Sequence, residues 1–492
     1  MSWHPPGIGG TWRSGRVVPA MKPGRREFLY SGGLALGGMA VGCGVREPAS
    51  ALVDDVSGLN PVVVDSILRP TRTSEIQVAL TRTRGTVSIG GGRYSMGGQI
   101  ASEHSLHIDM RSMRRLLWLD HEAGVVRVQS GMSWRALQDA IDPHGLSVKV
   151  MQSYSNFTVG GSVSVNCHGR YVGKGPIAGT VRALQLVTAS GEVRELSTLR
   201  EADLFGAVLG GYGGLGVVTE VELDLDPNDR IGRRADRISL DEYPSFFLER
   251  VLADPEVVLH NADLMPPQFD APLSIDWRRT DAPLTQTRRL VPRDLDYSRE
   301  QTLIWSATEL PGLELVRDRF LTEKLMREPA VTWRNHEASL DVRSLEPRTR
   351  LVSTYLLQEY FVPVEAFASF TRQMRRILIA SQANILNVSI RHSPADTRSL
   401  LRWAETDVFS FVVYHKQRSW AGADAETERW TQRLVAAALD HGGRYYLPYR
   451  LHATPMQFRR AYPEHIAFAR IRDAIDPRNR FRNRLWDKYL ST

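Results

Sequence analysis

The stretch 90-GGGRYSMGG-98 has a composition that suits anion binding. It holds five glycines in nine positions and follows the β-branched run 86-TVSI-89. Glycine has no Cβ, so its backbone can take a positive φ or come very close to another group. Several backbone N–H groups can then converge on a diphosphate, with Arg93 and Ser95 as further donors. By itself, the composition fits either a loose linker or an anion cradle.

Two further glycine clusters follow in order, 158-TVGGSVSVNCHG-169 and 209-LGGYGGLGVVTEVEL-223. Together with the first, they resemble the FAD-binding half of the vanillyl-alcohol oxidase flavoprotein superfamily. Three motifs in the same order are far more specific than a single glycine motif. The resemblance implies FAD as the cofactor and an α+β fold. In that fold a two-part FAD-binding domain of the PCMH type is joined to a substrate domain of sheet and helices.

The resemblance also implies particular cofactor contacts. The first cluster is similar to the family's pyrophosphate loop, and the other two are similar to segments that wrap the flavin and the adenine. The implied cofactor-binding residues are Gly90, Gly91, Gly92, Arg93, Tyr94, Ser95, Gly160, Gly161, Ser162, Asn166, His168, Gly169, Gly214, Val217 and Val218. The two valines are expected to contact the cofactor through their backbone only. For His168, the alternative is a capping or core histidine.

Tyr94 departs from the family pattern. Many relatives carry a histidine directly before the serine of this loop and bond it covalently to the flavin, whereas this chain has Tyr94 there. Cys167 adjoins His168 and does not stand upstream of Gly160-Gly161, where doubly linked relatives carry their flavin-bonding cysteine. We therefore predict FAD held without a covalent bond.

The second half of the chain holds candidates for substrate binding. The stretch 356-LLQEYFVPVEAF-367 resembles a strand of the sugar and alditol oxidases. The stretch 387-NVSIRHSPAD-396 resembles their Glu-Ile-Arg strand, with Ser389 in place of the glutamate. The resemblance implies that Glu359 and Arg391 bind substrate hydroxyls above the flavin. The alternative is a structural ion pair between neighbouring strands.

The stretch 444-RYYLPYRLHATP-455 stands where sugar oxidases have Pro-His-Trp-Gly-Lys. Pro448 matches, but Tyr449 replaces the histidine and His452 replaces the lysine. Other segments, at residues 158–170, 339–347 and 461–481, are similar to decaprenylphosphoryl-ribose oxidases, whose lysine near this stretch also has no counterpart here. The chain shares parts with both groups and the complete active-site pattern of neither.

Oxidation of a CH–OH group by a flavin sets the requirements for catalytic residues. The hydride must lie about 3–3.5 Å from flavin N5, and a base must accept the hydroxyl proton. Tyr449, His452 and His168 are the candidate bases. A histidine titrates at about 6.5, whereas the pKa of Tyr449 would have to fall from about 10. Arg450 could stabilise negative charge on the reduced flavin or bind an anionic substrate group. No metal site is expected.

These residues predict an FAD-dependent oxidoreductase that takes hydride from a CH–OH group of a sugar, polyol, lactone or glycolipid head group. The electrons would then pass to oxygen or a quinone. One alternative is C–N oxidation of the cytokinin type, because 93-RYSMGGQ-99 weakly resembles the corresponding segment of such enzymes in its serine and its Gly-Gln. Another is a flavin-binding protein without turnover, serving as an electron carrier or a structural element.

Short strands and helices must position these residues. Alternation and turn residues predict strands at 86–89, 105–110, 124–131, 181–188 and 216–225, and helices at 74–85 and 132–145. Ser133 is the expected N-cap of the second helix. Beyond residue 230, aromatic-rich strands at 351–362 and 408–415 alternate with amphipathic helices at 364–381 and 424–443.

The length of 492 residues is too great for one ordinary core, so several domains are expected. We predict an export signal and flexible N-terminus at 1–50 and an FAD-binding domain at 56–229. A substrate domain follows at 230–445. The last segment, 446–492, is predicted to return to the FAD-binding domain.

The N-terminus resembles a twin-arginine export signal. The stretch 24-GRREFLY-30 precedes the small, apolar run 31-SGGLALGGMAVG-42. That run is shorter than the about 20 residues that a membrane helix needs. Cys43 is similar to a lipoprotein attachment site, although Ala40 is unusual three residues before it. We expect export to the periplasm or cell envelope, with lipidation of Cys43 left open.

The overall composition is that of a soluble globular protein, with 42% hydrophobic and 24% charged residues. The net charge of +7 comes from 56 arginines and only six lysines, interleaved with acidic residues. Because no basic tail or cluster appears, we expect a small-molecule substrate and no nucleic-acid partner. Cys167 is the only cysteine besides Cys43, so no internal disulfide is expected.

Overall fold

The computed structural model describes residues 51–309, 326–347 and 349–490. All of them belong to one of the chain's two units, Pro48–Thr492. The predicted export signal and Cys43 lie outside the described residues. The described part is an α+β fold of mainly antiparallel sheets with helices, as the sequence predicted.

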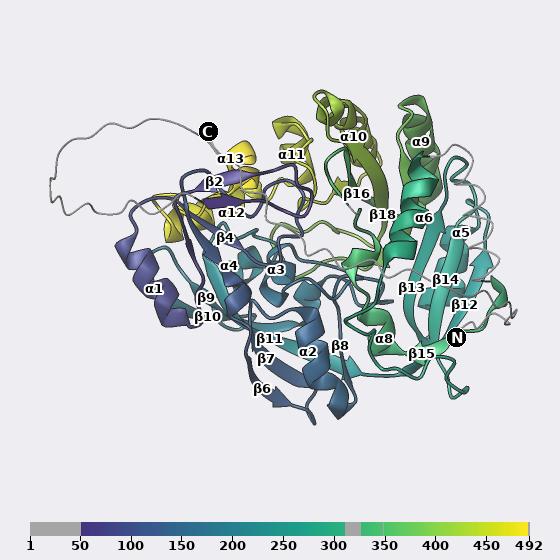
Figure 1. Ribbon diagram of the computed structural model, residues 1–492, viewed down its shortest axis with the longest axis horizontal. Coiled ribbons are helices and arrows are strands. Elements are labelled where there is room, and N and C mark those ends of the chain that lie inside the picture. The colour runs from purple at the N-terminus through teal and green to yellow at the C-terminus, as the bar shows by residue number, and fades with distance from the viewer. Residues whose placement is uncertain (1–50, 310–325, 348, 491–492) are drawn as a thin grey trace, which may run out of the picture. The chain divides into compact units, whose positions relative to one another are not determined.

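Three sheets form the part of the chain before residue 228 (Figure 1). The largest has six strands in the order β10-β9-β11-β7-β6, with β8 pairing with the end of β11, and it is antiparallel. A parallel sheet has the order β3-β5-β4, and β1 pairs with β2. The strands are β1 Ala51–Val53, β2 Val62–Val64, β3 Ser66–Leu68, β4 Val87–Gly90, β5 Leu106–Asp109, β6 Leu116–Asp120, β7 Val125–Gln129, β8 Leu146–Val148, β9 Val181–Val187, β10 Val193–Ser197 and β11 Val217–Pro227.

Four helices accompany these sheets, and side chains cap two of them. They are α1 Thr73–Arg82, α2 Trp134–Ile141, α3 Val159–Ser164 and α4 Ala202–Val208. The Ser133 side chain accepts a hydrogen bond from the N–H of Ala136 and caps α2, which confirms the predicted N-cap. Thr158 caps α3 in the same way, through the N–H of Gly161. The second cap places a hydroxyl beside the second glycine cluster.

An eight-stranded antiparallel sheet has the order β15-β12-β14-β13-β17-β18-β16-β19. Its strands are β12 Arg230–Arg237, β13 Val257–Leu264, β14 Leu273–Arg279, β15 Val331–Trp333, β16 Ser353–Pro363, β17 Ile385–Ser393, β18 Val408–Arg418 and β19 Arg444–Tyr445. The described helices of this region are α5 Tyr243–Phe246, α6 Ser298–Glu309, α8 Arg334–Ala338, α9 Phe367–Ala380 and α10 Ala423–Asp440.

The two faces of this sheet differ because side chains alternate along a strand. On one face, Tyr360 and Phe411 pack their rings against Phe370 of α9. Helix α10 contacts the same strands, and Figure 1 shows it beside them. On the other face, Glu359 and its cross-strand neighbour Val412 line a cavity. A strand whose two faces are both buried reads as a continuous apolar run, so Glu359 stands out in β16.

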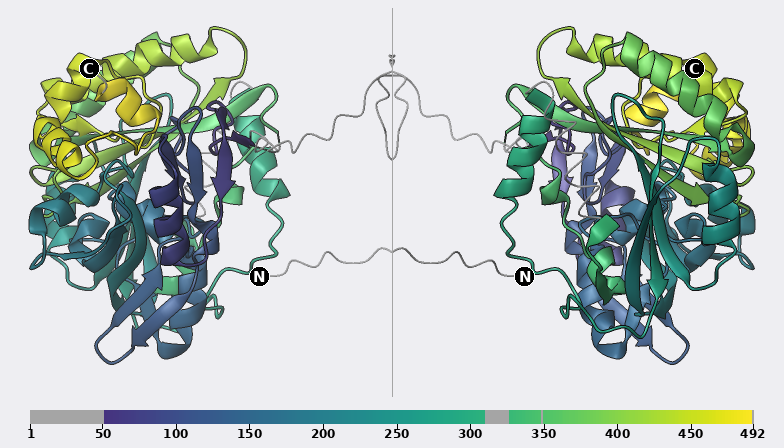
Figure 2. Two further views of the ribbon diagram at one scale, coloured as in Figure 1. Left: turned by 90° about the vertical axis from the view of Figure 1, so that its left-hand side faces the viewer. Right: turned by 90° about the vertical axis from the view of Figure 1, so that its right-hand side faces the viewer.

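The C-terminal segment returns to the first strands of the fold. It contains α11 Pro455–Ala461, α12 His465–Ile475 and α13 Arg484–Tyr489. The N–H of Val87 donates to the carbonyl of Arg480 at 2.7 Å, and the N–H of Met96 donates to the carbonyl of Pro448 at 2.8 Å. Figures 1 and 2 show the yellow C-terminal helices beside the purple and blue N-terminal strands. The first glycine loop is therefore held by residues from the far end of the sequence.

Among the described residues, no helix has both the length and the apolar character needed to cross a membrane.

Candidate functional site

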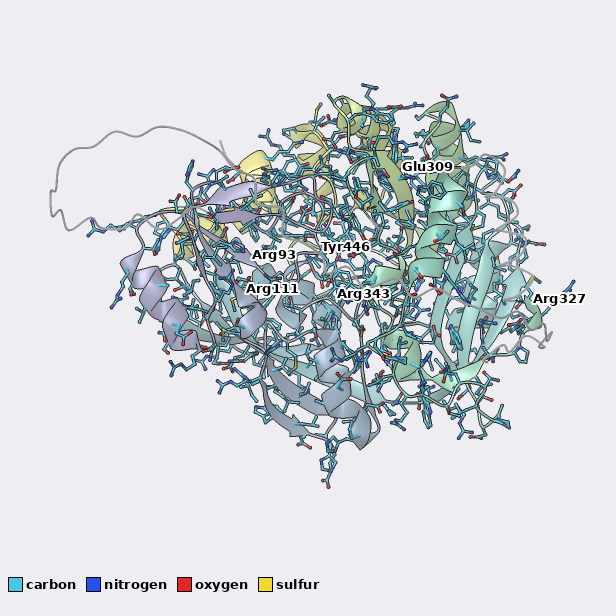
Figure 3. All side chains as sticks on the ribbon, viewed as in Figure 1. Arg93, Arg111, Glu309, Arg327, Arg343 and Tyr446 are labelled. Atoms are coloured by element: carbon cyan, nitrogen blue, oxygen red, sulfur yellow. The ribbon has the colours of Figure 1, made fainter. Side chains whose placement is uncertain are left out.

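A cavity of about 1220 Å³, measured with its open mouth, lies between the first glycine loop and the eight-stranded sheet. Gly91 to Met96 form one part of its wall, and Thr158, Gly161 and His168 form another. The sheet contributes Glu359 and Arg391, and the C-terminal segment contributes Tyr446, Pro448 and Tyr449. Figure 3 labels Arg93 and Tyr446, which belong to opposite ends of the chain and both line this cavity.

A second cavity of about 590 Å³ adjoins the first. The two share the wall residues Gly91, Ser95, Ile100, Thr158, Gly161 and Val165. From there the second cavity extends to the third glycine cluster, where Gly213, Gly216 and Val218 line it. The two adjoining cavities form one elongated site, called the flavin bed below, which all three glycine clusters border. It has room for an extended ligand.

Thr158 joins the first two clusters. Its Oγ1 accepts from the N–H of Gly92 at 3.2 Å and from the N–H of Gly161 at 3.3 Å. A Cβ added at Gly91 would lie 2.4 Å from that oxygen, and one at Gly161 would lie 2.8 Å from it. Glycine is therefore required at both positions because the threonine hydroxyl occupies the space of a side chain.

The loop after Gly92 presents free donors. Among the described residues, none accepts a hydrogen bond from the backbone N–H of Arg93, Tyr94 or Ser95, which all border the cavity. Arg93 has a φ of 64°, which turns the chain at this point. Successive N–H groups in such a turn form a concave anion site. This arrangement fits the diphosphate of FAD.

The Arg93 side chain is directed away from these donors. Its Nη2 lies 3.3 Å from the buried carboxylate of Asp109, which Arg111 also binds at 2.6 Å. Figure 3 shows Arg93 and Arg111 next to one another. Burial and the neighbouring guanidinium of Arg111 lower the pKa of Arg93. Its described contacts hold the loop through Asp109.

Glu359 is held between two other predicted site residues. Its Oε1 lies 2.5 Å from Nε2 of His168, and its Oε2 accepts from the hydroxyl of Tyr449 at 3.3 Å. Glu359 is 2% exposed and His168 is 4% exposed. The His168 ring packs against Trp403, Phe361 and Tyr446. Glu359, His168 and Tyr449 come from segments far apart in the sequence and meet at the cavity wall.

The charges around Glu359 fix its protonation. Burial raises the pKa of Glu359, but the charge and hydrogen bond of His168, followed by the charge of Arg391, outweigh burial and hold the pKa below its usual value. Burial and the Glu359 carboxylate raise the pKa of Tyr449 well above 10. Tyr449 therefore remains protonated at neutral pH and acts as a donor, which argues against the expectation that it is the base.

Arg391 lines the same cavity from β17. No described residue forms a hydrogen bond or an ion pair with its guanidinium, and its Nε is buried. The alternative of an ion pair with Glu359 on a neighbouring strand is not what the structure shows, because β18 lies between β16 and β17. Arg391 is thus a cation at the cavity wall that no described side chain pairs with.

His452 and Arg450 are not brought to the cavity. His452 Nδ1 lies 2.7 Å from the hydroxyl of Thr431, and its Nε2 lies 3.4 Å from the carboxylate of Asp424. Arg450 binds both carboxylate oxygens of Asp424, at 2.6 and 2.7 Å, and also binds Asn60. The hypothesis that His452 is the base and Arg450 the charge stabiliser has no geometric support, because both belong to a polar network at the start of α10.

Several predicted cofactor residues support the bed without lining it. A Cβ at Gly90 would lie 2.8 Å from the ring of His107, and one at Gly214 would lie 2.5 Å from Trp486. Gly169 is similarly close to the carbonyl of Met151.

Other predicted residues are buried or bonded elsewhere. The side chain of Asn166 forms hydrogen bonds with Asp396 and Ser399. Ser162 and Val217 are buried behind the cavities. In the third cluster, the glycines that border the bed are Gly213 and Gly216 rather than Gly214.

Thr158, Gln152 and Phe157 are among the wall residues that were not predicted. Thr158 stands at the start of the second cluster, where its position before two glycines was an available signal. Gln152 and Phe157 lie in the irregular segment between β8 and α3. The Phe157 ring contacts that of Tyr94 at 4.6 Å between centroids. No periodic pattern in that segment shows which of its side chains face inward.

Within the part of the chain that the structure describes, no three His, Cys, Asp or Glu side chains are grouped to hold a metal ion.

Comparisons with known proteins match both parts of the chain. Residues 64–197 match the family model of the FAD binding domain, and residues 260–490 match that of D-arabinono-1,4-lactone oxidase. The first match covers most of the N-terminal sheets. The second match covers most of the eight-stranded sheet and the C-terminal segment. The first match supports FAD as the cofactor.

Similar proteins include two oxidases and a dehydrogenase. Decaprenylphosphoryl-beta-D-ribose oxidase of Mycolicibacterium smegmatis is 27% identical over 446 residues, covering 85% of this chain and 93% of the relative. L-gulono-1,4-lactone dehydrogenase of Mycobacterium tuberculosis is 24% identical, covering 85% of this chain and 94% of the relative. Alditol oxidase of a Streptomyces species is 39% identical over 116 residues, or 23% of this chain and 27% of the relative.

Proposed function

Because the chain belongs to the oxidoreductases with a PCMH-type FAD-binding domain, we propose that it oxidises a CH–OH group of a sugar, polyol or lactone-like substrate. FAD supplies the hydride acceptor when it is bound, and the electrons then pass to oxygen or a quinone. The proposal is supported by the names of the relatives together with the polar groups of the cavity wall.

The observation that carries the proposal is the Glu359 carboxylate held between His168 and Tyr449. A CH–OH group loses a proton as well as a hydride, so the site needs an acceptor for that proton. Glu359 is kept ionised by His168 and Arg391, and it faces the cavity that the first glycine loop also borders. We propose that the Glu359–His168 pair accepts the proton of the substrate hydroxyl.

Two neighbours orient the substrate. The protonated hydroxyl of Tyr449 can donate to a substrate oxygen or to Glu359, depending on which acceptor is present. The Arg391 guanidinium, which has no partner among the described residues, can donate to further hydroxyls of a polyol or to a lactone carbonyl. These donors match a substrate with several oxygens better than a simple alcohol.

The test is anaerobic mixing of the purified flavoprotein with a panel of alditols, aldonolactones and aldoses, alongside a matched panel of amines. Bleaching of the yellow flavin absorbance by members of the first panel is the expected result. The Glu359→Gln variant should still bind FAD but be reduced at least about 100-fold more slowly, the scale of a lost general base. Bleaching by amines alone, or an unaffected Glu359→Gln rate, would contradict the proposal.

A further inference from the structure

The side chain of Gln152 is fixed in the cavity wall by two donors. Its Oε1 accepts from Nε1 of Trp134 at 2.9 Å and from the hydroxyl of Ser162 at 2.8 Å. Trp134 and Ser162 are completely buried. An indole N–H can only donate, so the amide atom facing it must be the oxygen. The amide is therefore oriented, and its NH₂ group points away from both donors.

The NH₂ group has no hydrogen-bond partner in the described part of the chain. No described residue accepts a hydrogen bond from Nε2 of Gln152, although the residue lines the larger cavity. Gln152 does not border the second cavity, which leads toward the third glycine cluster. An oriented donor in a cavity wall that no described residue pairs with is available to a ligand in the cavity.

The groups that orient Gln152 belong to the flavin bed. Ser162 lies in α3, directly after Gly160 and Gly161, and Trp134 lies in α2. Glu359 and Arg391, which serve the substrate in the proposed function, come from the eight-stranded sheet instead. The position of the amide is therefore set by residues next to the glycine clusters and not by the strands that carry Glu359 and Arg391.

We propose that the Gln152 amide donates a hydrogen bond to the flavin ring and favours its reduced state. Reduction adds electron density to the ring, and a fixed donor stabilises the electron-rich form more than the oxidised form. Trp134 and Ser162 are positioning residues that act through this amide. The inference rests on the flavin of the proposed function and not on its substrate.

The test is the reduction potential of the bound flavin, measured by titration with a reductant and a reference dye in the absence of substrate. Gln152→Met removes the donor with little change of volume. We expect the reduced form to lose about tenfold in relative stability, a fall of about 30 mV for a two-electron couple. Gln152→Glu keeps an oxygen for Trp134 and directs negative charge at the ring, so its potential should fall further.

Two more variants separate this role from a structural one. Ser162→Ala should lower the potential part of the way, because Gln152 loses one of its two orienting donors. Gln77→Met is the matched control. Its amide bonds to the carbonyl of Gly191 on the outside of the fold, so the potential should not change.

The order wild type, Gln152→Met, Gln152→Glu from high to low potential would support the inference. Unchanged potentials in both Gln152 variants would overturn it, and a raised KM with unchanged potential would assign the amide to the substrate instead. If Gln152→Met does not retain FAD, the comparison of Gln152→Glu with wild type tests the inference, and a potential that is not lower in the variant would overturn it. Should the proposed substrate class be wrong, no alcohol would reduce the flavin while the order of potentials would still hold.

Discussion

The Nε2 atom of His168 lies 2.5 Å from Oε1 of Glu359, and both side chains are buried in the wall of the larger cavity. His168 lies near the end of the second glycine cluster, and Glu359 lies in the middle of β16. This contact therefore joins a loop of the flavin bed to the sheet that carries Arg391. Its consequences for protonation can be tested directly.

His168→Leu should move the acid limb of activity to higher pH. Without His168, burial is no longer outweighed to the same extent, so the pKa of Glu359 should rise. The measurement is kcat/KM against pH, with the exposed His144→Gln as control. An acid limb that stays in place would mean that Glu359 does not titrate in the reaction.

The same contact predicts a loss of stability in acid. The pKa of Glu359 is lower in the folded protein than its ordinary value of about 4.3. The ionised form therefore contributes stability above that pH, and the contribution is lost as the pH falls through the folded-state pKa. Thermal unfolding of wild type and Glu359→Gln should converge as the pH is lowered. A constant difference in Tm across this range would contradict the assignment.

Acid precipitation of the purified protein should release its yellow colour into the supernatant. Burial, followed by the charges of Glu346 and Asp341, raises the pKa of Tyr94 to about 12, and its ring packs against Phe157. Cys167 is buried, and burial raises the pKa of its thiol, so it is also unreactive. Tyr94→Phe should bind FAD as the wild type does. Colour that remains in the pellet would show a covalent link.

Gly91→Ala should weaken FAD binding by at least about tenfold, since the new Cβ would lie 2.4 Å from Oγ1 of Thr158. The Thr158 hydroxyl would have to move, and with it the contact between two glycine clusters. Gly85→Ala is the matched control, because nothing lies within 4 Å of its Cβ position. The measurement is the dissociation constant of FAD by fluorescence quenching. Equal constants for both variants would show that the cradle is less tight than described.

Arg450→Met should leave kcat/KM within about twofold of wild type while lowering Tm slightly. Asp424 is half exposed, so the expected loss is below about 1 kcal/mol. The hydrogen bond of His452, then the charge of Arg450, lower the pKa of Asp424, so this contribution is present above its ordinary pKa and lost in acid. A large loss of kcat with unchanged Tm would contradict this prediction and would support a catalytic role for Arg450.

The glycine clusters could be predicted from the sequence for a physical reason, whereas Glu359 was predicted from its resemblance to a strand of the sugar and alditol oxidases, and a physical reason agrees with it. Glycine tolerates close approach, and a glutamate within an apolar strand has to face a polar site or a partner. The strand period also assigns Glu359 and its neighbours to one face. Tyr449 was brought to the cavity as the resemblance implied, although its raised pKa makes it a donor.

The positions of Arg450, His452 and Gln152 could not be predicted. All three lie in irregular segments, where no period relates sequence to direction. Whether such a side chain faces a cavity or a surface network depends on distant partners, here Asp424 for the first two and Trp134 for the third. The export signal and Cys43 remain predictions.

The first glycine loop is closed by residues from near the end of the chain. The amide of Gln99 donates to the carbonyls of Leu447 and Tyr449, and the second of these contacts spans 350 positions of the sequence. During synthesis the glycine loop leaves the ribosome long before these partners exist. The cofactor bed is therefore assembled only after translation is nearly complete, and flavin capture should be a late step in maturation. A chain truncated before residue 447 is expected to lack a finished flavin bed, however well its first sheets fold.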